Sequence, residues 1–154
     1  MRIAFDSNIL AYLAGVRTLE ADDPKIARVQ AMSKELRPNA ELVAPVQALG
    51  ELFVVLRRGG VPPELARQRV DRAAEGFITA PSTSITLKGA LELAVEHKLQ
   101  FWDSLIVTAA SEAGCSLLLS EDMQDGFVHR GLTIVNPLAE TLHPQLARLL
   151  DTQA

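Results

Sequence analysis

The sequence predicts one α/β domain in which a parallel sheet is covered by helices on both faces. Short apolar segments alternate with longer segments of helical periodicity along most of the chain, and this alternation favours parallel strands joined by helices. At 154 residues the chain has the length of one domain, and 48% hydrophobic with 22% charged residues is ordinary globular composition. We therefore expect a single domain over residues 1–154.

Strands are expected where short apolar runs are bounded by turn-forming or charged residues. The clearest are Arg2–Phe5, Leu42–Pro45, Ser116–Ser120 and Leu132–Val135, and a weaker one lies near Phe77–Thr79. A strand buried on both faces needs no alternation of polar and apolar residues. These runs therefore suit the interior of a parallel sheet.

Helices are expected between these strands, starting with the apolar run after Asp6. The other helices are Val46–Arg58, Pro63–Glu75, Leu87–His97, Asp103–Ala113 and a C-terminal segment, Leu138–Leu150. Pro144 is expected to kink or divide the last of these, because proline lacks a backbone N–H and clashes with the preceding turn. The breaks at residues 59–63 and 80–82 are interpreted as turns, since composition does not shift across them.

Composition also bears on location. No stretch approaches the roughly 18 uninterrupted apolar residues that a membrane helix needs, and Asp6 interrupts what would have to be the apolar core of a signal peptide. We expect a cytoplasmic protein with no membrane association. Cys115 is the only cysteine, so an internal disulfide is impossible. It is expected to be a small buried side chain, with a reactive thiol as the alternative.

The net charge of −4 argues against a surface coated in positive potential, but local basic groups remain. Arg57 and Arg58 end one predicted helix, and Arg67, Arg69 and Arg72 lie along the next. Both groups could present guanidinium to phosphate. For each group taken alone, a solvated helix face is the favoured interpretation.

The most informative feature is a set of acidic residues at the ends of strands and the starts of helices. We call Asp6, Glu51, Asp103 and Asp122 the four carboxylates. Asp6 and Asp122 follow two predicted strands and should emerge at one edge of a parallel sheet. Glu51 lies four residues after Gln47 on the same helical face. Asp103 opens a helix, where the helix dipole favours an anion. The four could therefore converge.

Each position also has a simpler explanation. Asp6, Ser7 and Asn8 are all favourable N-cap residues, and Asp103 could be a plain N-cap as well. Asp122 could belong to a polar turn, and a glutamate on a helix is usually solvated. The coincidence of all four at one sheet edge is harder to explain in these ways.

Converging carboxylates require a cation or bound protons. Two of them about 5 Å apart repel by roughly 3 kcal/mol at an effective dielectric of about 20. An all-oxygen donor set suits Mg²⁺ or Mn²⁺ and disfavours zinc. His97, His129 and His143 show no paired ligand spacing and are expected at the surface or at helix ends. Hard cations on carboxylates are suited to phosphodiester hydrolysis, because they activate water and absorb charge on phosphate oxygens.

Four motifs in order resemble the PIN-domain nucleases, and in particular the VapC-type toxins of bacterial toxin–antitoxin pairs. They are Ile3-Ala4-Phe5-Asp6-Ser7-Asn8, Gln47-Ala48-Leu49-Gly50-Glu51-Leu52, Phe101-Trp102-Asp103-Ser104-Leu105-Ile106 and residues 118–126, and Gly131–Pro137 looks like the family's last strand. The resemblance covers nearly the whole chain. It departs from the family pattern where Ser7 and Ser120 replace the more frequent threonine, which keeps the hydroxyl.

The resemblance implies a three-layer PIN-like fold and a metal-dependent endoribonuclease. The four carboxylates would form the site for one or two Mg²⁺ or Mn²⁺ ions, Asn8 and Ser120 would support it, and Asp125 would be an additional candidate ligand. The substrate would be single-stranded or loop RNA. The family further implies a homodimer and a small cognate antitoxin.

Two other classes compete with this interpretation. One is a phosphatase with an aspartate nucleophile, but that chemistry normally needs a second acid where the chain has Asn8. The other is a catalytically silent PIN-like module that binds RNA or a protein. The intact set of four carboxylates weighs against it.

Overall fold

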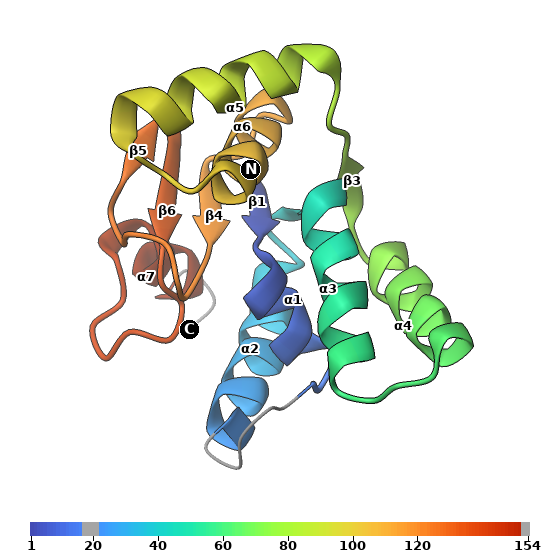
Figure 1. Cartoon of the computed structure of the whole chain (residues 1–154). Helices are drawn as coiled ribbons and strands as arrows, with labels where there is room; N and C mark the ends of the chain where they lie inside the picture. The colour runs from blue at the N-terminus through green and yellow to red at the C-terminus, as the bar shows by residue number, and fades with distance from the viewer. Residues whose placement is uncertain (17–21, 152–154) are drawn as a thin grey trace.

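A computed structural model describes residues 1–16 and 22–151 of the chain (Figure 1). Its strands are β1 (Arg2–Phe5), β2 (Glu41–Pro45), β3 (Ile78–Ala80), β4 (Leu117–Leu119), β5 (Val128–His129) and β6 (Leu132–Val135). Its helices are α1 (Ser7–Leu13), α2 (Asp23–Leu36), α3 (Val46–Arg58), α4 (Pro63–Glu75), α5 (Ser84–His97), α6 (Phe101–Glu112) and α7 (Pro144–Asp151).

The strands form one six-stranded sheet in the order β3-β2-β1-β4-β6-β5. Every pairing is parallel except that of β5 with β6, so the sheet is mostly parallel with one antiparallel edge. The predicted α/β fold is therefore confirmed. The antiparallel edge strand β5 was not predicted, because its two residues carry too little pattern to be recognised.

The core lies on the two central strands. Residues 3–5 of β1 and 117–119 of β4 are all buried, as expected for parallel strands covered on both faces. Around the sheet, α5 packs on α6, α1 packs on both α2 and α3, and α3 lies beside α4 (Figure 1). Cys115 belongs to this core, and burial raises the pKa of its thiol to about 11. The prediction of a buried cysteine is confirmed.

The predicted boundaries were wrong at three helices. The helix predicted from Leu87 begins at Ser84, because Thr83 and Thr86 form a reciprocal capping box. The helix predicted from Asp103 begins at Phe101. The C-terminal helix is not kinked by Pro144 but starts there, at a position where the missing N–H of proline costs nothing.

One helix went unpredicted. It is α2, whose buried residues Val29, Met32, Ser33 and Leu36 follow helical spacing amid charged neighbours. No helix within residues 1–16 and 22–151 has the length and apolar character to cross a bilayer.

Candidate active site

Asp6 and Ser120 are neighbours at the carboxyl edge of the sheet. β1 and β4 pair in parallel with Phe5 opposite Leu119, so the next residue of each strand emerges at the same level. The Ser120 hydroxyl donates to Asp6 Oδ2 at 2.7 Å, and the Ser7 backbone N–H donates to Asp6 Oδ1 at 2.7 Å. Asp6 is only 4% exposed. It thus caps α1 and is also held across the sheet by the neighbouring strand.

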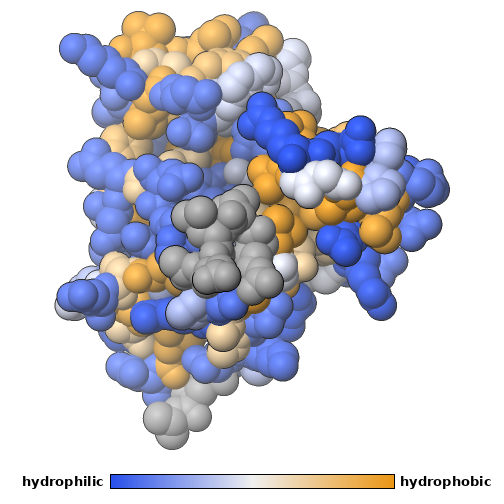
Figure 2. All heavy atoms as spheres, turned by 60° about the horizontal axis from the view of Figure 1, so that its bottom comes forward, coloured by the Kyte–Doolittle hydropathy of each residue, from blue (hydrophilic) through white to orange (hydrophobic). Residues whose placement is uncertain are grey.

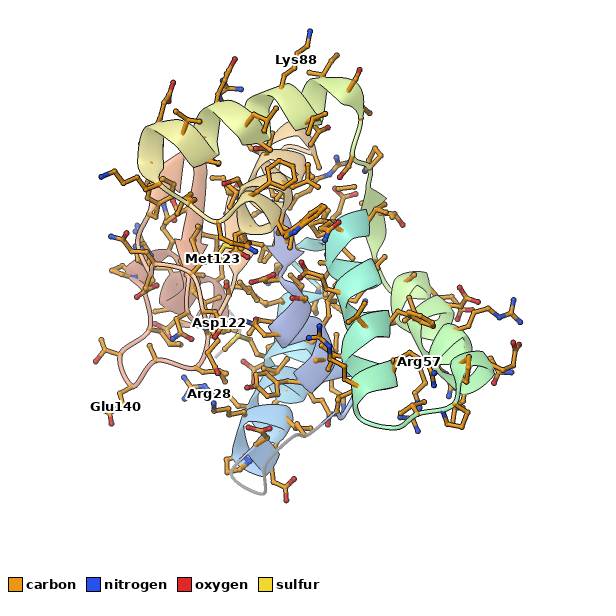
Figure 3. All side chains as sticks on the ribbon, in the orientation of Figure 1. Arg28, Arg57, Lys88, Asp122, Met123 and Glu140 are labelled. Atoms are coloured by element: carbon orange, nitrogen blue, oxygen red, sulfur yellow. The ribbon has the colours of Figure 1, made fainter. Side chains whose placement is uncertain are left out.

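Asn8 links α1 to the loop after β4. Its Nδ2 donates to Asp122 Oδ2 at 2.9 Å, and Figure 3 shows Asp122 on that loop, beside α1. The loop is held in turn by Ser120, whose Oγ accepts from the Met123 N–H at 3.2 Å. Two polar residues that the sequence singled out as supporting groups therefore each hydrogen-bond one of the four carboxylates.

Glu51 and Asp103 approach the same edge from helices. Glu51 lies in the second turn of α3, where its Oε1 accepts from Gln47 Nε2 at 3.2 Å. Asp103 is the third residue of α6. The expectation that it opens or caps this helix was wrong, because the cap is Gln100, whose side chain accepts from the Asp103 N–H at 3.0 Å. The Asp103 carboxylate does not cap the helix, and its charge interacts with those of Glu51 and Asp122.

Electrostatics connects the four carboxylates. Burial raises the pKa of Asp6 to about 6; the Asp103 and Glu51 charges add to this, while the bonds from Ser120 and Ser7 oppose it. Burial also raises the pKa of Asp103, helped by the charges of Glu51 and Asp122. Asp103 thus interacts electrostatically with each of the other three, and Asp6 also interacts with Glu51. Their role as ligands stays a prediction.

Asp125 has a different neighbour. Its Oδ1 accepts from the Asn136 backbone N–H at 2.8 Å, which ties the loop after β4 to the end of β6. The sequence suggested Asp125 as an additional ligand. The structure gives it a role in holding this loop together.

The residues fit a hard divalent cation by donor chemistry. The set is all oxygen, and two members bear raised pKa values partly because of their acidic neighbours, which is the repulsion that a cation would relieve. Within residues 1–16 and 22–151, however, no three His, Cys, Asp or Glu side chains are arranged to hold a metal ion. Asp6, Glu51 and Asp122 each accept a side-chain hydrogen bond instead.

Sequence reasoning missed a polar cluster beside this edge. Glu121 Oε1 accepts from the Tyr12 hydroxyl at 3.1 Å and from Lys25 Nζ at 3.0 Å. Its Oε2 is buried without a hydrogen-bond partner among the described residues. The three residues come from the loop after β4, from α1 and from α2, and no spacing in the sequence signals that they meet. They fasten the residue next to Asp122 to two helices.

The fold and the site geometry therefore define an α/β protein with a mostly parallel sheet and with acidic residues along the carboxyl edge of that sheet. The family profile of the PIN domain matches residues 3–127, which is well over half of the chain. The chain belongs to the PIN-domain family. No curated protein matches it in sequence.

Three solved structures share the fold. VapBC2 from Rickettsia felis, bound to a DNA fragment from its promoter, is 15% identical with a TM-score of 0.62, over 79% of this chain and 89% of that one. Mycobacterium tuberculosis VapC20, a sarcin–ricin loop cleaving toxin, is 18% identical with a TM-score of 0.61, over 78% and 89%. A toxin–antitoxin complex from Klebsiella pneumoniae is 19% identical with a TM-score of 0.63, over 88% and 97%.

Proposed function

We propose that this protein is a metal-dependent endoribonuclease and the toxin of a toxin–antitoxin pair. The observation that carries the proposal is the electrostatic coupling of the four carboxylates, at the carboxyl edge of the sheet, in a member of the PIN-domain family. Likeness in fold to three toxin or toxin–antitoxin structures supports the toxin role. The protein would act in the cytoplasm, as one PIN domain.

The four carboxylates would hold Mg²⁺ or Mn²⁺. A bound cation of this kind supplies activation of water and stabilisation of charge on phosphate oxygens. Ser120 orients Asp6 and Asn8 orients Asp122 through the hydrogen bonds described above, so these two would fix the geometry of the ligands. Asp125, one oxygen of which bonds the Asn136 backbone, would be at most an additional ligand.

The substrate in this proposal is RNA. Support comes from Mycobacterium tuberculosis VapC20, whose name describes cleavage of the sarcin–ricin loop. Which RNA this chain would cut does not follow from its fold.

A cognate antitoxin and a second copy of the chain are the proposed partners. The sequence offers several apolar helix faces for a homodimer without saying which is shared, and on α3 the side chains of Leu49 and Leu56 are buried in the core. The exposed apolar side chains of α3 are instead Val46, Phe53 and Val54. Figure 2 shows apolar residues interspersed with hydrophilic ones over the lobe formed by α3 and α4. Sedimentation showing only a 16.7 kDa species at micromolar concentration would contradict the homodimer.

The experiment that tests the activity is an RNA cleavage assay on the purified protein. Cleavage should require added Mg²⁺ or Mn²⁺ and should stop with EDTA, because carboxylates alone supply no electrophile. The Asp6→Asn variant, purified in parallel, controls for a contaminating nuclease. Undiminished cleavage in EDTA would overturn the metal mechanism, and absence of cleavage with either metal on any RNA would favour a silent binding module.

A further inference from the structure

A cleft that contains Glu51, one of the four carboxylates, runs along one face of α3. It has a volume of about 430 Å³ and is lined by Ser7, Gln47, Glu51, Val54, Val55, Arg58, Gln100 and Trp102. Glu51 thus belongs both to the carboxylate cluster and to the wall of this cleft. Whatever lies in the cleft touches the proposed site.

The α3 wall is one continuous stripe. Gln47, Glu51, Val54 or Val55, and Arg58 follow one another at intervals of three or four residues, which places them on one helix face. The eleven steps from Gln47 to Arg58, at about 1.5 Å each, give the stripe a length of about 16 Å. The stripe therefore extends well beyond the carboxylates and ends in a positive charge.

Trp102, from α6, also lines the cleft. It is 49% exposed, although a tryptophan is usually mostly buried. The Phe101 ring meets it edge to face at a centroid distance of 4.9 Å. An exposed indole next to an acidic site offers a flat apolar surface to a partner.

Arg58 is the cation of the cleft. It is exposed, and within residues 1–16 and 22–151 no carboxylate forms an ion pair with it. Its neighbour Arg57 differs, since Arg57 Nη1 donates to the Val61 carbonyl at 2.8 Å, and Figure 3 shows it on the side of α3 that faces α4. Two adjacent arginines thus offer a matched pair, one in the cleft and one outside it.

We propose that this cleft binds an unpaired stretch of the RNA next to the bond that is cut, with one base stacked on Trp102 and a backbone phosphate against Arg58. The inference rests on the proposed nuclease function. An indole can stack only on a base whose face is accessible, so the cleft selects single-stranded over duplex RNA. Arg58 offsets the repulsion between Glu51 and the RNA backbone.

The fluorescence of Trp102 can be used to test the proposal, because Trp102 is the only tryptophan in the chain. Its fluorescence is followed while a single-stranded oligouridylate of about six nucleotides is added, with Ca²⁺ replacing Mg²⁺ to neutralise the carboxylates. The oligonucleotide should quench the fluorescence, and an abasic oligonucleotide of equal length should quench it far less. Equal quenching by both, or none by either, would overturn the proposal.

Variants separate the two contacts by anisotropy of a labelled oligonucleotide. Trp102→Ala should weaken binding by between about 5-fold and about 150-fold, the range expected for loss of one base stack, and Trp102→Phe should restore most of it. Arg58→Ala should weaken binding and lower the salt dependence by about one phosphate contact, whereas Arg57→Ala should leave both unchanged. Equal effects of Arg57→Ala and Arg58→Ala would overturn the role of Arg58.

The two levels of inference can fail separately. If RNA quenches the fluorescence of Trp102 but is never cut with Mg²⁺ or Mn²⁺, the proposal of RNA binding in the cleft is supported and the proposed nuclease function is contradicted. If the Trp102→Ala variant cuts RNA normally with unchanged KM, the nuclease function is supported and RNA binding in the cleft is contradicted. If the fluorescence changes with protein concentration and not with RNA, the exposed indole belongs to an interface between copies of the chain, which also overturns the proposal.

Discussion

The candidate site has two halves that are built differently. The strand half, Asp6 and Asp122, lies on the sheet edge and is held by hydrogen bonds from Ser120 and Asn8 across more than a hundred residues of sequence. The helix half, Glu51 and Asp103, rests on α3 and α6 and has local partners within four residues. The strand half is thus held by hydrogen bonds from distant segments, buried at Asp6 and exposed at Asp122, and the helix half by the packing of two helices.

From this difference we infer that the two halves of the site have different functions. A ligand oriented by a hydrogen bond from a distant segment can fix the position of a cation, whereas side chains that line an open cleft can meet a substrate. We therefore expect changes in the strand half to affect metal binding most. Changes along the cleft should affect RNA binding most.

The largest expected effect is that of Asp6→Asn. The variant should lose RNA cleavage by at least about 100-fold, because it removes a charged ligand at the most constrained position. The metal-free variant should be as stable as the wild type or more so at neutral pH, since asparagine caps a helix as well as aspartate does and relieves carboxylate repulsion. Cleavage assays beside thermal melts measure both. Near-normal cleavage would remove Asp6 from the site.

The next effect is a pH dependence of stability in the metal-free protein. The pKa of Asp6 is raised to about 6 in the folded state from an ordinary value of 3.8, so the folded state holds this proton more tightly. The contribution of Asp6 to the free energy of unfolding is complete below about pH 3.8 and is lost as the pH rises through about 6. That loss is of the order of 3 kcal/mol.

Comparison with Asp6→Asn isolates this contribution. The free energy of unfolding of the wild type, minus that of the variant, should fall between about pH 4 and pH 6 and then level off. Urea denaturation at several pH values in EDTA measures it. A difference that stays constant with pH would show that Asp6 is not perturbed.

A smaller effect sharpens the contrast between the halves. Asn8→Ala should weaken Mn²⁺ binding by about 10-fold to 100-fold, because Asp122 loses the partner that orients it. Gln47→Ala, which removes the local partner of Glu51, should weaken it less. Thermal shifts on adding Mn²⁺ compare the two variants. Equal losses would remove the distinction between the halves.

The smallest expected effect concerns the cluster of Glu121, Tyr12 and Lys25. Lys25→Met should destabilise the protein by about 1 kcal/mol, since it removes a partly exposed ion pair and leaves Glu121 with Tyr12 alone. Metal binding should change less than in Asn8→Ala. Urea melts together with Mn²⁺ titration check this. A loss of metal binding as large as that of Asn8→Ala would make Lys25 part of the site.

The sequence predicted the strands of the site well because buried parallel strands produce uninterrupted apolar runs, as in β1 and β4. It failed at α2, where few apolar residues stand among charged neighbours, and at the start of α6, where Gln100 caps the helix although glutamine is not a favoured cap. Contacts between distant segments, such as Glu121 with Lys25, leave no local pattern. The acidic residues could therefore be found from sequence, but not the hydrogen bonds that orient them.

The central claim is that the four carboxylates act together to hold a divalent cation, and titration calorimetry with Mn²⁺ tests it most directly. The wild type should bind Mn²⁺, and Asp6→Asn, Glu51→Gln, Asp103→Asn and Asp122→Asn should each weaken binding by at least about tenfold. Glu140→Gln, a change to an exposed loop residue shown in Figure 3, should have no effect. Failure of the wild type to bind Mn²⁺, or binding by all four variants as tight as that of Glu140→Gln, would contradict the claim.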